Sequence, residues 1–120
     1  MTVLIPFVDK RLDILDCKRY GNPVVIFRQE IFPDEIDDEI ENLNKRVSEV
    51  LSRFDHNNDY IALTGSPFFI GLILFEAGKR FRKIRVLRFD RKEHAYYAVE
   101  VGHIEENAVV QTQTNSSTRV

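Results

Sequence analysis

The chain has 120 residues, of which 43% are hydrophobic and 30% are charged, with a formal net charge of −2. This length and apolar content favour one folded domain with a real core and exclude a disordered chain. The single cysteine, Cys17, excludes an intrachain disulfide and a cysteine-based zinc site. No basic signal-peptide start and no apolar run near the ~20 residues that span a bilayer are found, so we expect a cytoplasmic protein without membrane contact.

The first quarter of the chain has the composition of short strands and turns. Residues 3–8 form a candidate edge strand, where Pro6 is tolerated because an edge N–H need not pair. Residues 12–17 alternate loosely, and residues 20–23 have a turn composition. Residues 24–27 are continuously apolar, as in a central strand that is covered on both faces. We therefore predict an N-terminal β-hairpin that leads into a central strand.

Residues 33–54 carry the clearest helical pattern. Their apolar side chains recur every three or four positions, which is the spacing of one helix face. Acidic residues fill the first turns and basic residues lie further along, as the helix dipole favours. The predicted apolar face consists of Ile36, Ile40, Leu43, Val47, Val50, Leu51 and Phe54.

A strand, a turn, a helix and a second strand are predicted between residues 59 and 89. Residues 60–64 form the first strand, and Gly65 turns the chain. Ser66 suits the N-cap through its hydroxyl, and Pro67 suits the first helical position. The helix that follows is almost entirely apolar until Glu76, so we expect it to be buried. The core is predicted to contain Ile26, Ile61, Leu63, Leu72, Leu74, Val86 and Leu87.

The alternation of strands and helices predicts the fold class. Strands at 24–27, 60–64 and 84–89 with helices between them indicate parallel pairing, and residues 96–101 should return antiparallel. The fold is thus predicted as α/β, a small Rossmann-like βαβαβ unit with a mixed sheet, an N-terminal β-hairpin and a C-terminal antiparallel hairpin. We assign residues 1–105 to a single domain and the polar residues 106–120 to a flexible tail.

The turn Thr64-Gly65-Ser66 is the first candidate site. It connects the end of a predicted strand to the start of a helix, where open α/β sheets bind ligands and where free N–H groups attract anions. Glycine permits close approach of a ligand, and the two hydroxyls can donate hydrogen bonds. A capped helix start without a ligand explains the same residues.

A basic segment is the second candidate. Eight of the seventeen Lys and Arg residues lie between Lys79 and Lys92, and we take Arg82, Lys83 and Arg85 as candidate ligand-binding residues. A solvated face explains the segment, and so does nucleotide or nucleic-acid binding. A third interpretation pairs it with the acidic residues 34–41 of a second copy, giving a homo-oligomer. Within the chain, Glu76 should pair with Lys79 or Arg80.

Residues 59–101 resemble the closing part of Rossmann-like sensor domains of antiviral systems, the CARF and SAVED families. That resemblance implies a cyclic oligonucleotide ligand held near the turn before the helix, at Thr64, Gly65 and Ser66. It also implies a role in antiviral defence or as a viral accessory protein, although this chain is shorter than a complete sensor of that type. The resemblance is carried by Ile61–Leu63, Gly65-Ser66-Pro67, Phe68–Phe75, Val86-Leu87-Arg88-Phe89-Asp90 and Tyr97-Ala98-Val99-Glu100-Val101.

Two functions remain open from the sequence. No set of nucleophile, base and orienting residue can be assembled, and the histidines are scattered, so we predict no enzyme activity, no cofactor and no metal site. One interpretation is a small self-associating interaction or structural protein. The other is a binding module for an anionic nucleotide-type ligand, either a cyclic oligonucleotide or single-stranded nucleic acid.

Overall fold

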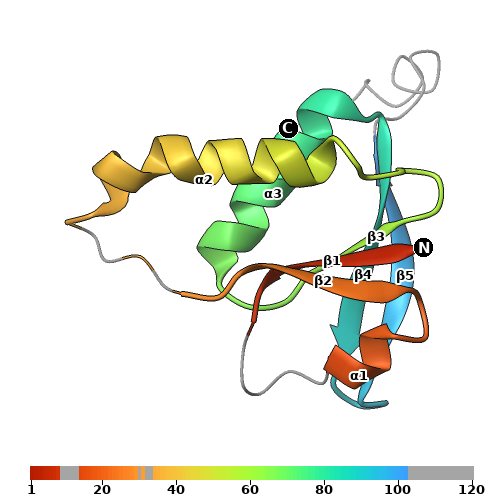
Figure 1. The fold of residues 1–120 in the computed structure, drawn as a ribbon. Coiled ribbons are helices and arrows are strands. Elements are labelled where there is room, and N and C mark those ends of the chain that lie inside the picture. The colour runs from red at the N-terminus through yellow and green to blue at the C-terminus, as the bar shows by residue number, and fades with distance from the viewer. Residues whose placement is uncertain (9–13, 30, 32–33, 103–120) are drawn as a thin grey trace, which may run out of the picture.

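A computed structural model describes residues 1–8, 14–29, 31 and 34–102 of the chain. A five-stranded sheet forms its centre, with helices on both faces (Figure 1). The predicted α/β fold class is therefore confirmed. The elements in chain order are β1 (Thr2–Phe7), α1 (Ile14–Cys17), β2 (Asn22–Phe27), α2 (Ile36–Leu51), β3 (Tyr60–Ala62), α3 (Pro67–Arg80), β4 (Lys83–Asp90) and β5 (Ala95–Gly102).

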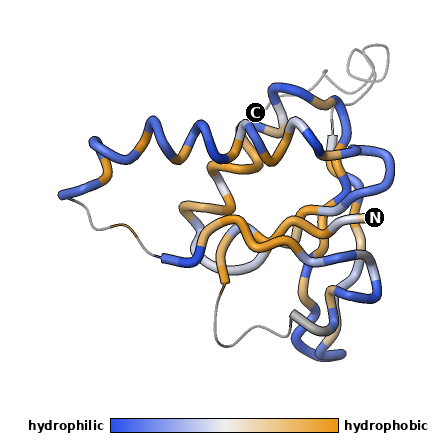
Figure 2. Tube along the Cα trace, viewed as in Figure 1, coloured by the Kyte–Doolittle hydropathy of each residue, from blue (hydrophilic) through white to orange (hydrophobic). Residues whose placement is uncertain are grey.

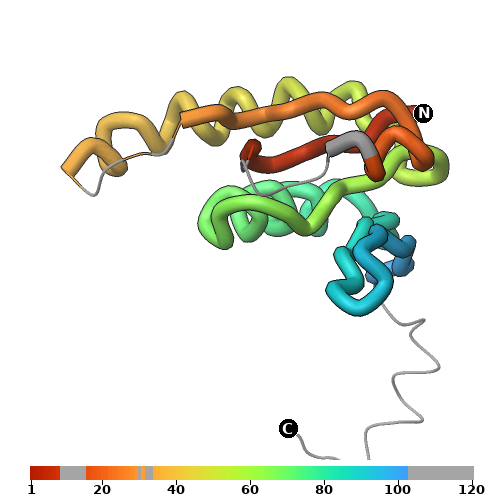
Figure 3. The backbone as a smooth tube through the Cα atoms, turned by 90° about the horizontal axis from the view of Figure 1, so that it is seen from below, coloured from red at the N-terminus to blue at the C-terminus, as the bar shows by residue number. Residues whose placement is uncertain are grey.

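The sheet is mixed, and its strand order is β2-β1-β3-β4-β5. The first four of these strands are parallel to one another, whereas β5 is antiparallel to β4, as predicted. Figure 3 shows β2 and β5 at opposite sides of the sheet. From β1 the chain passes through α1 to β2 on one side of β1, and then through α2 to β3 on its other side. The strand order therefore reverses between β1 and β3. Such a reversal point is where open α/β sheets bind ligands, outside the carboxyl ends of the strands.

The predicted N-terminal hairpin is wrong. β1 and β2 pair in parallel, with Leu4 beside Val24, and α1 lies between them in the chain. β1 is an interior strand, not an edge strand, and its run Val3-Leu4-Ile5 is buried on both faces. The edge strand is β2, whose Val24 is exposed. Both segments are continuous apolar runs, and that pattern alone does not tell which of the two lies inside.

The two long helices cover one face of the sheet, and α1 covers the other (Figure 1). α2 begins at Ile36 and buries Leu43, Val47 and Leu51, which confirms the predicted apolar face; Pro33 lies outside the described residues. In Figure 2, α2 is mostly hydrophilic with hydrophobic residues recurring along it, whereas α3 is mostly hydrophobic. α2 therefore lies at the surface and contributes one stripe to the core.

α3 begins at Pro67, as predicted, but Ser66 makes no side-chain hydrogen bond to cap it. Only one face of α3 is fully buried, formed by Phe69, Ile73 and Ala77, which follow one another at intervals of four residues. Phe75 on another face is 66% exposed. The expectation of a buried α3 is thus wrong, because two layers of structure can enclose only one side of a helix that lies on a sheet.

The core consists of one cluster on each face of the sheet. On the α2–α3 face, the ring of Phe69 lies 5.1 Å from the ring of Phe7 and 4.7 Å from that of Phe27. The predicted core residues Ile26, Ile61, Val86 and Leu87 are buried, while Leu63, Leu72 and Leu74 are only partly buried beside the core. The opposite cluster contains Val3, Ile5, Cys17, Tyr60, Ala62, Leu87 and Tyr96. The predicted tail, residues 106–120, lies outside the described residues.

Candidate functional site

The turn after β3 lies at the carboxyl edge of the parallel strands, beside the end of β1. Gly65 has a φ angle of +96°, in the region that glycine adopts without strain. A Cβ atom at this position would lie only 2.4 Å from the carbonyl oxygen of Phe7. Glycine is therefore required here by the fold itself, because the turn packs directly against the backbone of β1.

Thr64 is enclosed by the fold. It is 8% exposed, and its side chain lies near the hydroxyl of Tyr96. Burial raises the pKa of Tyr96 to about 12, although the neighbouring Thr64 side chain acts in the opposite direction. Thr64 is thus buried, while Ser66 is partly exposed where α3 starts.

The structure does not bring the predicted basic residues to this turn. Ile61 pairs with Val86, so Thr64 lies level with Phe89 rather than with the start of β4. Arg85 and Lys83 therefore lie roughly 13 and 20 Å away along the strand direction, at about 3.3 Å per residue. Arg82 precedes them at the same edge of the sheet. The two groups of predicted site residues occupy opposite edges of the sheet.

Arg85 has structural partners at that opposite edge. Its guanidinium donates to the Asn57 carbonyl oxygen at 2.9 Å and to the Tyr60 hydroxyl. It also lies 4.3 Å from the centre of the Tyr60 ring. These contacts hold the loop before β3 against β4, on the face opposite Ile84 and Val86. Lys83 forms an exposed ion pair with Glu100 at 3.8 Å.

A different pair of arginines lies at the carboxyl edge, level with the Gly65 turn. Arg88 and Arg91 line a surface hollow of about 850 Å³ together with Leu63, Phe89, Asp90 and Tyr97. Among the described residues, the side chain of neither arginine forms an ion pair or a hydrogen bond. The sequence did not point to this group, because Arg88 lies directly across from Tyr97 only through the register of β4 with β5, which no local pattern reveals.

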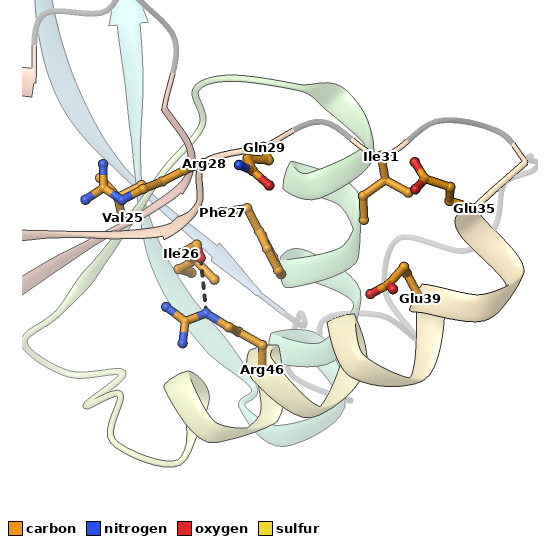
Figure 4. A pocket seen from close by; sticks show the side chains of 9 residues that line it. All are labelled: Val25, Ile26, Phe27, Arg28, Gln29, Ile31, Glu35, Glu39 and Arg46. Atoms are coloured by element: carbon orange, nitrogen blue, oxygen red, sulfur yellow. Dashed lines mark hydrogen bonds between the residues drawn. The ribbon is translucent and has the colours of Figure 1, made fainter.

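A second hollow, of about 710 Å³, lies between the end of β2 and α2. Figure 4 shows Phe27 and Ile31 pointing into it, with Glu35 and Glu39 at the start of α2 beside them. The Nε atom of Arg46 donates to the carbonyl oxygen of Ile26 at 3.2 Å (Figure 4). This carbonyl points away from β1, since the next one, on Phe27, accepts from Val8. Arg46 of α2 therefore binds a carbonyl oxygen on the outer side of the edge strand β2.

The other edge strand carries exposed apolar side chains. β5 pairs with β4 over its whole length of 8 residues, and Tyr97, Val99 and Val101 alternate along one of its faces. Their exposed fractions are 40%, 36% and 49%. In the described part of the chain, no segment pairs with the other side of β5.

The ion pair predicted within α3 is present, since Glu76 pairs with Lys79 at 3.1 Å. No group of three or more His, Cys, Asp or Glu residues in the described ranges is arranged to hold a metal ion. Within the same ranges, none of the helices has the length and hydropathy that crossing a membrane requires.

The fold and these surfaces define a small Rossmann-like α/β unit with an open sheet edge at β5 and hollows at its surface. Residues 7–103 match the model of the family described as phage Pam3 gp32-like protein. The match extends over most of the chain, so the protein belongs to this family, which is consistent with a small viral accessory protein. Comparison with curated proteins and with solved structures found no significant match.

Proposed function

We propose that this member of a phage protein family is a self-associating, non-enzymatic interaction protein, and that two copies join through their β5 strands. The open edge of β5 with its stripe of Tyr97, Val99 and Val101 is the observation that carries the proposal. A sheet edge presents unpaired N–H and C=O groups, which readily pair with another strand. Exposed β-branched and aromatic residues on that strand add side-chain contacts across the new pair.

β5 lacks the devices that usually prevent edge pairing. It contains no proline, its register with β4 is continuous, and Glu100 is its one charged residue. The edge at β2 differs, because Arg46 of α2 binds the outward carbonyl of Ile26. The contrast between the two edges supports β5 as the side through which the protein associates.

The sequence of β5 is complementary to itself in one antiparallel register. With a two-fold axis at Val99, this residue faces Val99 of the second copy, and Tyr97 faces its Val101. On the other face of the sheet, Ala98 then lies opposite Glu100 of the second copy. An axis at Glu100 would place two carboxylates opposite each other, which is destabilising. The register at Val99 avoids that repulsion and joins the two apolar stripes.

A pair of lysine substitutions in β5 tests the proposal. Val99→Lys places two ammonium groups opposite each other at the axis, so light scattering at micromolar concentration should change from twice 14.1 kDa to 14.1 kDa. Ala98→Lys is the matched control, because the same charge one residue earlier faces Glu100 of the second copy and should leave the dimer intact. A wild-type mass of one chain, or equal dissociation by both variants, would contradict the proposal.

A second candidate function is binding of an anionic nucleotide-type ligand, which the resemblance to CARF and SAVED domains implies. It is supported by the position of the Gly65 turn, beside the point where the strand order reverses and next to the start of α3. Native mass spectrometry with cyclic oligoadenylates tests it. A bound ligand retained in the gas phase is expected, and an unchanged apo spectrum across the series would reject this candidate.

A further inference from the structure

We propose that the hollow at the end of β4 binds single-stranded nucleic acid, with Arg88 and Arg91 contacting phosphates and Tyr97 stacking on a base. This inference names a ligand and a site for the second candidate function and rests on it. Its arginines lie outside the proposed β5–β5 contact, whereas Tyr97 belongs to both surfaces.

The hollow combines the two kinds of side chain that unpaired nucleotides require. Both arginines are exposed and, in the described residues, without an ion pair or hydrogen bond, so their guanidinium groups are available to phosphate oxygens. Tyr97 is 40% exposed on the same face as Arg88, whereas the ring of Phe89 projects from the other face and packs against Tyr96. A cationic surface with an exposed aromatic ring is the arrangement by which proteins bind single strands without reading their sequence.

The cross-strand geometry places a cation and a ring on the same face. Arg88 and Tyr97 are direct partners in the antiparallel pair β4–β5, so their Cβ atoms are about 5 Å apart. The single acid of the hollow, Asp90, accepts the backbone N–H of Lys92 at 2.9 Å and is thus directed into the hairpin turn. Its carboxylate is partly engaged there, which reduces its competition with an incoming phosphate.

The shape of the hollow favours a strand over a free mononucleotide. Arg88, Phe89, Arg91 and Tyr97 are all exposed, so the hollow is a surface feature, whereas small-molecule sites enclose most of their ligand. A strand can lie across such a surface and contact it at one or two nucleotides. A second β5 strand would lie beside β5 in the plane of the sheet, while Tyr97 projects from its face, so both surfaces can be occupied together.

Fluorescence anisotropy with a short labelled oligothymidine tests the site. Arg88→Ser with Arg91→Ser should weaken binding at least about tenfold at low salt. The matched control, Lys45→Ser with Arg53→Ser, removes the same charge from α2 and should change it less than about twofold. For two phosphate contacts, wild-type affinity should fall about sevenfold between roughly 50 and 200 mM salt, and the first double variant should lose this part of the dependence.

Substitution of Tyr97 separates stacking from charge. Tyr97→Ser should weaken binding about 5- to 150-fold, the range reported for loss of one stacked base, and Tyr97→Phe should restore it. Binding of oligothymidine that is unaffected by Arg88→Ser/Arg91→Ser and by Tyr97→Ser would reject this site while leaving nucleotide binding in place. Absence of binding to oligothymidine and to cyclic oligoadenylates alike would reject both. Equal affinity for a mononucleotide would reject the strand as the ligand.

Discussion

Gly65 is the position where one added methyl group should damage the fold most clearly. In Gly65→Ala the new Cβ would lie 2.4 Å from the Phe7 carbonyl oxygen and 2.8 Å from the Phe7 Cβ. Both contacts are with an interior strand, so neither can be relieved by rotating the end of a flexible side chain. The backbone φ of +96° adds strain, because residues with a Cβ rarely adopt it.

The expected loss follows from these two contributions. A left-handed conformation costs about 1–2 kcal/mol for a residue other than glycine, and an extra buried methyl group costs about 1–3 kcal/mol. Together they amount to about 2–5 kcal/mol, a large part of the roughly 6–18 kcal/mol expected for a domain of this size. The midpoint of thermal unfolding should therefore fall by roughly 10–20 °C.

Two other glycines provide the control within the same protein. Gly71 and Gly78 lie in α3, and a Cβ at either position meets no atom within 4 Å. Alanine there should raise the free energy of unfolding by about 0.5–1 kcal/mol, since glycine is a poor helix former. Circular dichroism melts of the three variants decide the matter. If Gly65→Ala melted within a few degrees of wild type, the tight contact between the turn and β1 would be refuted.

Three further predictions concern the core, the pH dependence of stability and the edge of the sheet at β2. Phe69→Ala should lower the free energy of unfolding by about 3–5 kcal/mol, because Phe69 is fully buried. Leu74→Ala should lower it by only about 1–2 kcal/mol, because Leu74 is partly buried. Similar losses for the two variants in urea titrations would contradict the assigned face of α3. An unfolded tyrosine ionises near pH 10, whereas burial raises the pKa of Tyr96 to about 12. The stability that the neutral phenol contributes is thus complete below about pH 10 and is lost as the pH rises to about 12. In Tyr96→Phe the urea midpoint should fall less steeply over this pH range than in the wild type. An equal fall in both proteins would contradict the prediction. Arg46→Ala frees the Ile26 carbonyl and should produce species larger than a dimer in light scattering; an unchanged mass would show that Arg46 is not needed to block that edge.

Much of the fold could be predicted from local pattern. The apolar stripe of α2 and the series of strands and helices from β3 onward follow directly from periodicity and turn chemistry. The position of Pro67 at the start of α3 follows from its fixed φ and missing N–H. These features depend on neighbours within a few residues, so one sequence suffices to find them.

The pairing of β1 and the buried face of α3 could not be predicted in the same way. Both depend on which distant segment covers an apolar run, and apolar runs such as Val3-Leu4-Ile5 and Val24-Val25-Ile26 read alike. The candidate site failed for a related reason. Arg85 and Thr64 both carry plausible chemistry, but only the register of β3 with β4 reveals that they lie at opposite edges. Arg88 and Tyr97 become neighbours through another register, that of β4 with β5.

The difference between the two sheet edges bears on what kind of assembly the chain can form. If β2 and β5 were both open, β5 of one copy could pair with β2 of the next, and such head-to-tail contacts continue into open filaments unless they close into a ring. The bond from Arg46 to Ile26 opposes that pairing at β2. Pairing of β5 with β5 uses the same surface on both copies and consumes the open edge of each. Closed dimers are therefore the expected product, and the apolar stripe of Tyr97, Val99 and Val101 is continued across the joined sheets instead of remaining an aggregation site.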